Sequence, residues 1–484
     1  MALIIPLCWM SRGHCDLKIW APKEGKQSVS LVGEGLGRYE FWDWFTPTGP
    51  QDSTYGYFFT RARSGLKWAS PKVDALVQLQ YNQFFDLPGA GSVAASPQGP
   101  LGFGPIYFGQ TGERSAHRVF IKHLWADMKD PLGVGLSGRV GRFDYADGFE
   151  LPSGDAKIDW VRKVRISERL IGPFGFSAVT RSFDGAWAWW DQSKFRVDQL
   201  LSHPTQGGFE ESAGNTIEKI DLLASTLTIK KSALIPHAQE RAFFMRYVDH
   251  RPVTQRVDNT GRSAASSVDV DINTFGWDMA GAFPFGPGEV DAMSWMALQE
   301  GDWYELNHRA WAWALEGGYQ WKKVFLQPWL RAGFFNGSGD SNPGDTVHET
   351  FFQILPTGRQ YAFFPLYDLM NNKDLFAQCM VKPIAAMTVR SDWHFLELDE
   401  RNDRLYGGSG ATQEKGNIFG YVGRNSFGKA DVGNLLDVSI VYDATQWLKV
   451  STYYGHFFGG SVLEKIYPNG SDANFFFTEI SVKF

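Results

Sequence analysis

The sequence of 484 residues lacks the features that mark several common protein classes. It has 3 cysteines, an odd number without a CxxC spacing, so neither a disulfide framework nor a zinc site is expected. No run approaches the roughly 18 consecutive apolar residues that a transmembrane helix needs. The net charge of −6 argues against a nucleic-acid partner, because nucleic-acid-binding domains are usually strongly basic.

Patterns that would indicate catalysis are also missing. Histidines such as His203, His237 and His308 have no catalytic partner implied by their spacing. Asp269 and Asp271 resemble the carboxylate pair of a glycosidase, but their position on one face of a strand accounts for them without chemistry. Because there is also no phosphate-binding glycine loop and no metal-ligand spacing, we expect neither an enzyme nor a bound metal or cofactor.

The first 27 residues form a poorly defined N-terminal segment. Their short apolar run at residues 2–7 is interrupted by Pro6, with no positive charge before it and no small-residue cleavage site, which makes it a poor secretory signal. Either the export signal is missing from this version of the sequence or the start of the gene is misplaced. We expect a single domain over residues 28–484.

From residue 28 onward, apolar and polar residues alternate with a period of two, which is typical of strands with two different faces. In residues 60–68, for example, Leu66 and Trp68 share one face while arginines and a lysine share the other. The same alternation occurs in residues 73–82, 134–140, 268–273 and 436–442. A soluble sandwich and a membrane barrel both show it.

The lengths of the connections distinguish these two architectures. Tight connections at residues 69–72, 129–131 and 443–446 alternate with long ones at residues 88–114 and 459–473. Short periplasmic turns and long external loops are typical of an outer-membrane barrel, whereas a sandwich has no reason for them to alternate. Counting from either end of the sequence places both termini on the periplasmic side.

Aromatic residues make up 15% of the chain, and many cluster near predicted strand ends, as interfacial girdles require. The clusters contain Trp42, Trp44, Phe45, Tyr55, Tyr57, Phe58, Trp187, Trp189, Trp190, Tyr453, Tyr454, Phe457 and Phe458. The last strand alternates and ends on Phe484, which resembles the signal read by the barrel assembly machinery. These features predict an all-β, up-and-down antiparallel barrel in the bacterial outer membrane. We expect about 18 strands (16 as the alternative), long extracellular loops, and a polar lumen lined by water and guanidinium groups.

Several motifs, in a specific order, resemble those of the alginate-export porin family. The opening strand at residues 35–41 (GLGRYEF) and the second strand at residues 60–66 (TRARSGL) are similar to the family's first two strands. The most specific resemblance is GSGD at residues 337–340 followed by TFFQILPTGRQY at residues 350–361. YGHFFGG at residues 454–460 resembles the penultimate strand. The family fold implies a monomeric barrel of eighteen strands that passes an anionic exopolysaccharide outward.

Positive charge in the lumen is the chemistry that such a cargo requires. Uronate polymers carry one carboxylate per sugar, and arginine binds carboxylates with a bidentate fork. Alternation and, for Lys122, a match to a family position predict these lumen residues: Arg61, Arg63, Lys67, Lys122, Arg139, Arg331 and Arg390. The alternative is a ladder with lumen acids that rigidifies the wall, for which the candidates are Asp74, Asp269, Asp271 and Asp437.

Three questions stay open at this point. The dense basic segment at residues 162–181 either folds inward or pairs with acids, and the uncharged stretch at residues 88–112 is either a lid or a mobile surface loop. Residues 362–365 (AFFP) are apolar where alginate exporters carry basic residues. The predicted function is therefore a porin for an anionic polysaccharide or related anionic solute, surrounded by outer-membrane lipid and lipopolysaccharide. The alternatives are a general or small-solute porin and a non-conducting structural or adhesive barrel.

Overall fold

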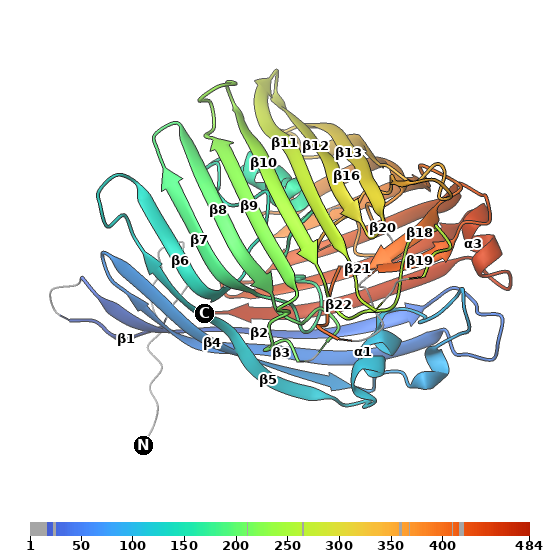
Figure 1. Cartoon of the computed structure of the whole chain (residues 1–484). Coiled ribbons are helices and arrows are strands. Elements are labelled where there is room, and N and C mark those ends of the chain that lie inside the picture. The colour runs from blue at the N-terminus through green and yellow to red at the C-terminus, as the bar shows by residue number, and fades with distance from the viewer. Residues whose placement is uncertain are drawn as a thin grey trace.

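Figure 1 shows the computed structural model of the chain as one large barrel. The structure describes residues 17–22, 26–210, 212–263, 266–357, 361–366, 368–408, 410–415 and 421–484. The N-terminal segment predicted to be poorly defined therefore lies largely outside the described residues, as do residues 358–360 of the family-like motif. Within the described residues no helix is long and apolar enough to cross a membrane.

The barrel closes because its first strand, β2 (Ser28–Asp43), pairs in antiparallel register with its last, β22 (Ala473–Lys483). In the described residues, 18 antiparallel strands make up the wall, which confirms the predicted fold class. The strands between β2 and β22 are β3 (Thr54–Ala69), β4 (Val73–Phe85), β5 (His117–Met128), β6 (Leu136–Phe143), β7 (Phe183–Asp191), β8 (Phe195–Pro204), β9 (Ile220–Ile229), β10 (Ala238–Asp249), β11 (Val270–Phe285), β12 (Gly288–Trp303), β13 (Leu306–Gln320), β14 (Trp329–Gly337), β16 (Asn372–Ile384), β17 (Met387–Glu397), β20 (Asp431–Asp443) and β21 (Leu448–Gly459).

Short elements decorate this wall. β1 (Leu17–Trp20) pairs with β2, and β15 (Val347–His348) runs parallel to β13. The remaining short elements are the hairpin of β18 (Arg404–Gly408) and β19 (Tyr421–Asn425), the helices α1 (Phe103–Thr111), α2 (Ala156–Val161) and α3 (Ser461–Ile466), the 3-10 turn η1 (Ala90–Ser92) and the π-helical turn η2 (Arg162–Ile166). Figure 1 shows α1, α3 and the β18–β19 hairpin at one end of the barrel, opposite the C-terminus.

The two ends of the barrel differ as expected. We call the end with short connections, such as residues 70–72 and 385–386, the turn end, and the other the loop end. The chain ends at the turn end, where Phe484 and Gly33 exchange backbone hydrogen bonds of 2.8 and 2.9 Å. One loop-end connection departs from the pattern. β12 and β13 are joined there by Tyr304 and Glu305 alone, so alternation of connection lengths fails at this hairpin.

The girdle interpretation of the aromatic clusters is wrong for most of the residues it named. Phe58, Trp190, Tyr454 and Phe458 are 38–46% exposed and lie on the outer face. Most of the other members are buried and face the interior: Trp42, Trp44, Phe45, Tyr57, Tyr453 and Phe457 are each at most 4% exposed. The reason is that neighbouring residues of a strand point to opposite faces, so a run of aromatics supplies both faces at once.

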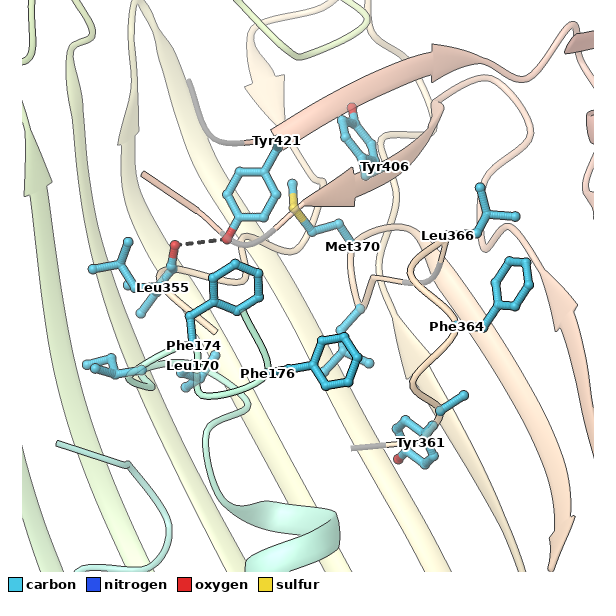
Figure 2. Packing of buried hydrophobic residues seen from close by; sticks show 14 of the residues in the cluster. Leu170, Phe174, Phe176, Leu355, Tyr361, Phe364, Leu366, Met370, Tyr406 and Tyr421 are labelled. Carbon is cyan, nitrogen blue, oxygen red and sulfur yellow. Dashed lines mark hydrogen bonds between the residues drawn. The ribbon is translucent and has the colours of Figure 1, made fainter. Parts of the chain in front are cut away.

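Two long loop-end connections fold back into the barrel and fill its middle. We call residues 144–182 inner loop A and residues 338–371 inner loop B. They meet through backbone hydrogen bonds from Leu355 to Leu170 (2.7 Å) and from Gly172 to Leu355 (2.8 Å). Figure 2 shows side chains from both loops and from the β18–β19 hairpin pointing toward one another, with the Tyr421 hydroxyl donating to the Ile354 carbonyl at 2.8 Å. The interior therefore holds an apolar cluster beside its polar wall, which the expectation of a water-lined bore did not include.

Candidate functional site in the barrel interior

Inner loop A enters the barrel as a capped helical segment. The Asp155 carboxylate accepts hydrogen bonds from the backbone N–H groups of Lys157 (3.0 Å) and Ile158 (3.4 Å), which starts α2. Burial tends to raise the pKa of Asp155, but these two N–H donors and the nearby Lys231 lower it below its usual range. Residues 156–181 carry six Lys and Arg against two Asp and Glu. The basic segment noted in the sequence thus folds inward, and it also pairs with acids.

The arginines of inner loop A share wall carboxylates with arginines of the wall itself. Asp278 of β11 contacts Arg162 of the loop at 2.9 Å and Arg241 of β10 at 3.0 Å. Glu316 of β13 contacts Arg165 at 3.5 Å.

The same Glu316 carboxylate also contacts Arg169 of the loop at 3.7 Å and Arg331 of β14 at 2.9 Å. Asp392 of β17 contacts Arg165 at 3.4 Å and also Arg390. These side chains are almost entirely buried, so the loop is bound to the wall by ion pairs in a low-dielectric interior.

Five of the seven predicted residues lie in one part of the wall, on β3, β5 and β6. Arg61 and Arg63 both contact Glu34, at 3.2 and 3.6 Å, and Arg61 also donates to the Ser177 carbonyl of inner loop A at 3.0 Å. Arg139 forms a bidentate pair with Asp127, at 2.6 and 2.7 Å, and its guanidinium lies 3.9 Å from the Trp125 ring centre. Lys67, Arg63 and Arg139 line one hollow of about 470 Å³ at the turn end.

The fifth, Lys122, faces the interior because of a local irregularity in the sheet. The register between β4 and β5 shifts next to it, so Lys122 is an extra residue, as in a β-bulge. Its ammonium is fully buried and donates to the Asp144 carboxylate and the Arg181 carbonyl, both at 2.5 Å, and to the Ser182 hydroxyl at 2.9 Å. Lys122 therefore holds the two ends of inner loop A.

The last two predicted residues lie on two later strands of the wall, Arg331 on β14 and Arg390 on β17. Arg331 is buried between Asp291 (2.8 Å) and Glu316 (2.9 Å). Arg390 pairs with Asp392, donates to the Tyr361 carbonyl at 2.8 Å, and lines a second hollow of about 370 Å³. All seven residues thus belong to the inner face, but Arg61, Lys122 and Arg331 are not among the described residues that line either hollow.

The second hollow contains a cation that the sequence did not single out. Lys163 of inner loop A is exposed in this hollow, and the described residues place no ion-pair partner beside it. Burial raises the pKa of Glu168, while the Thr357 hydroxyl and Lys163 act in the opposite direction. Arg38, between Glu479 (2.5 Å) and the Phe176 ring, also lines the hollow. The density of basic residues at 162–181 was the only sequence signal for Lys163.

The predicted acids divide between the two faces of the barrel. Asp74 contacts Lys129 at 2.7 Å at the turn end, and Asp437 is buried and accepts from the Tyr453 hydroxyl at 3.0 Å. The assignment of Asp269 and Asp271 to the lumen is wrong. Ile272 and its even-numbered neighbours on β11 are buried inside, so Asp271 faces outward, where it pairs with Arg246 at 2.6 Å. Here the polar residues of the strand lie outside because they are close to the loop end.

One histidine and two carboxylates approach the spacing of a metal site. Ligand atoms of Asp392, His394 and Asp437 lie within 4.8 Å of one another. However, Arg390 and Arg165 already contact Asp392, and His394 lies 2.9 Å from Asp374. The two guanidinium groups supply the positive charge that a metal ion would bring, so the chemistry of this cluster favours an ion-pair network.

The loop end of the interior is covered by aromatic side chains. Phe364 stacks on Trp44 with a centroid distance of 5.4 Å, and Phe45 stacks on Tyr467 at 4.8 Å; all are buried. The uncharged stretch predicted as a lid or a surface loop packs here as well, because α1 brings Phe103 to within 5.4 Å of Trp42. We call Trp44, Phe45, Phe364 and Tyr467 the aromatic cover. The apolar residues 362–365 thus belong to a packed closure at the loop end.

A family model described as alginate export matches residues 58–477. The chain belongs to the alginate export family. No curated protein matches this family member at a significant level. Among solved structures, OccAB2 of Acinetobacter baumannii is similar with a TM-score of 0.58 and 9% identity, covering 94% of this chain and 98% of that one.

A BenF-like porin from Pseudomonas fluorescens Pf-5 is similar with a TM-score of 0.56 and 9% identity, covering 94% and 99% of the two chains. OpdK of Pseudomonas aeruginosa, solved with vanillate, is similar with a TM-score of 0.53 and 7% identity, covering 94% and 98%. At such identities the likeness shows the fold alone. Family and fold are those of an outer-membrane channel for solutes.

Proposed function

We propose that this alginate export family member is an outer-membrane channel for carboxylate-bearing anions, with an alginate-like polyuronate as its first candidate cargo. Its turn end would face the periplasm and its loops the outside, and the terminal strand would be read by the barrel assembly machinery. We propose that the protein is not an enzyme. The observation that carries the proposal is Lys163, an exposed cation on the basic segment 156–181 of inner loop A, beside the 370 Å³ hollow.

The two candidate cargoes, a polyuronate and a small carboxylate, share the same binding group. A polyuronate presents one carboxylate per sugar, and anion pores use Arg and Lys to bind such groups weakly and at several sites. The hollows of about 370 and 470 Å³ would each hold a small carboxylate without any rearrangement, and a porin with a similar fold has been solved with vanillate, a small carboxylate. A polymer would require inner loop A to move. A small-carboxylate porin is therefore the second candidate.

The direct test is a planar-bilayer recording of the purified protein. We expect the reversal potential in a salt gradient to show anion preference, and an oligouronate to block the current. Replacing Lys163→Gln should reduce the anion preference and weaken the block several-fold, because it removes a charge without an ion-pair partner in the described residues. A matched control is Lys465→Gln on α3, an exposed lysine at the loop end. Cation preference, or identical effects of the two variants, would contradict the proposal.

A further inference from the structure

The two ends of the barrel carry opposite charge. The eight turn-end connections between residues 70 and 447 contain seven Lys and one Asp. Apart from inner loops A and B, which fold into the barrel, the seven loop-end connections contain 15 Asp and Glu against 11 Lys and Arg. We call the seven turn-end lysines the lysine rim: Lys72, Lys129, Lys194, Lys230, Lys231, Lys322 and Lys323. Such segregation creates a potential that attracts polyanions to one mouth and disfavours them at the other.

Part of the lysine rim is available to a ligand. Lys72, Lys194 and Lys323 are exposed, and the described residues give them no ion-pair partner. The other four contact acids: Lys129 with Asp74 (2.7 Å), Lys230 with Asp191 (2.6 Å), Lys231 with Asp155 (3.4 Å) and Lys322 with Glu289 (3.0 Å).

The contacts of the rim lead inward to inner loop A. Asp155, the residue that caps α2, is the partner of Lys231, and Glu289 is shared by Lys322 of the rim and Lys157 of α2 (3.3 Å). From α2 the basic segment continues to Lys163 in the 370 Å³ hollow. These ion pairs thus connect the lysine rim to the segment of inner loop A that carries Lys163.

The accessible space is also at this end. Both hollows are lined by residues near the turn end, such as Lys67 and Asp74 for one and Thr388 and Ser451 for the other. At the loop end the members of the aromatic cover pack against one another and are at most 4% exposed. Charge and space therefore both favour the same mouth.

From these observations we infer that the lysine rim is a recognition surface of the channel, which captures a polyanionic uronate chain at the turn end before the chain reaches Lys163. This inference rests on the proposed function and adds to it a recognition surface. The lysine rim acts as a capture site through long-range attraction, so its effect falls steeply with ionic strength.

The test uses the full-length barrel inserted into planar bilayers in one known orientation, with an oligouronate of about eight sugars added to one chamber at a time. In about 50 mM salt, we expect half-block at a concentration on the order of tenfold lower from the turn side than from the loop side. The triple variant Lys72→Gln, Lys194→Gln and Lys323→Gln should reduce this difference to about twofold. The matched control changes three exposed loop-end lysines, Lys219, Lys429 and Lys465, to Gln and should leave the difference unchanged.

The outcomes separate this inference from the proposed function. Equal block from both sides in an anion-preferring wild-type channel would overturn capture at the lysine rim and leave the channel function standing. A difference that survives in full in the rim variant, or that falls equally in the rim variant and the control, would overturn the role of the lysine rim. Absence of anion preference and of block from either side would contradict the proposed function itself.

Discussion

Replacing Glu316→Gln tests whether shared carboxylates hold inner loop A in the barrel. This buried group of β13 contacts Arg331 at 2.9 Å, Arg165 at 3.5 Å and Arg169 at 3.7 Å. Breaking a buried ion pair by removing one partner typically costs about 3–5 kcal/mol, because the remaining charge is left uncompensated. Here the cost should lie at the lower end. Arg331 keeps Asp291, Arg165 keeps Asp392 and Arg169 keeps the Tyr361 hydroxyl at 2.8 Å.

A loss of about 3 kcal/mol in the free energy of loop docking corresponds to roughly a hundredfold increase in the undocked population. Hydrogen exchange measures this population at the backbone amides of residues 156–171, and single-channel recordings measure it as more frequent high-conductance states. The matched control is Asp271→Asn, which breaks a surface ion pair with Arg246 and should cost at most about 1 kcal/mol. If amide exchange in residues 156–171 is equal in Glu316→Gln and wild type, the shared carboxylates do not hold the loop.

Two further outcomes follow from the same interior. Burial raises the pKa of Asp147 and of Asp368 to about 7, whereas a free aspartate has a pKa of roughly 3.9. Between pH 4 and 7 the docked loops therefore bind more protons than the undocked loops. Docking weakens as the pH rises through this window. Conductance should therefore be higher at pH 8 than at pH 5, and the pair Asp147→Asn and Asp368→Asn should flatten this dependence; a wild-type conductance that falls over this range would contradict it. Phe364→Ala in the aromatic cover should cost about 3–5 kcal/mol of local packing and raise the open probability of the channel. Phe395→Ala is the control and should leave the open probability unchanged, because Phe395 lies on the outer face and is 47% exposed. Equal open probabilities in the two variants would refute the role of the cover.

The sequence predicted the wall of the barrel well because a membrane strand must pair with a neighbouring strand on each side and must alternate its faces. The alternation in residues 60–68 gives the correct face for Arg61, Arg63 and Lys67. The same rule fails at Asp269 and Asp271. Near the loop end the outer face leaves the apolar layer, so polarity no longer identifies the lumen.

The interior was harder to predict, since its contents come from loops that have no period. The density of arginines at residues 162–181 indicated an unusual segment, but the acids that bind it, such as Asp278 and Glu316, lie on strands far away in the sequence. The aromatic cover was missed for a similar reason. Phe364 and Tyr467 become neighbours of Trp44 and Phe45 only when two loops fold over the same mouth.

The ion pairs between inner loop A and the wall determine how a cargo would open this channel. Each loop arginine that contacts a wall carboxylate competes with a wall arginine for it, as Arg165 does with Arg331 at Glu316 and with Arg390 at Asp392. An incoming carboxylate would offer the loop arginines a substitute partner while the wall arginines keep their own acids, so undocking the loop would leave no buried charge unpaired. A cargo without negative charge offers no such exchange and would have to break the ion pairs outright. The same network would thus keep the barrel closed in the absence of anions and select anions by the cost of opening it.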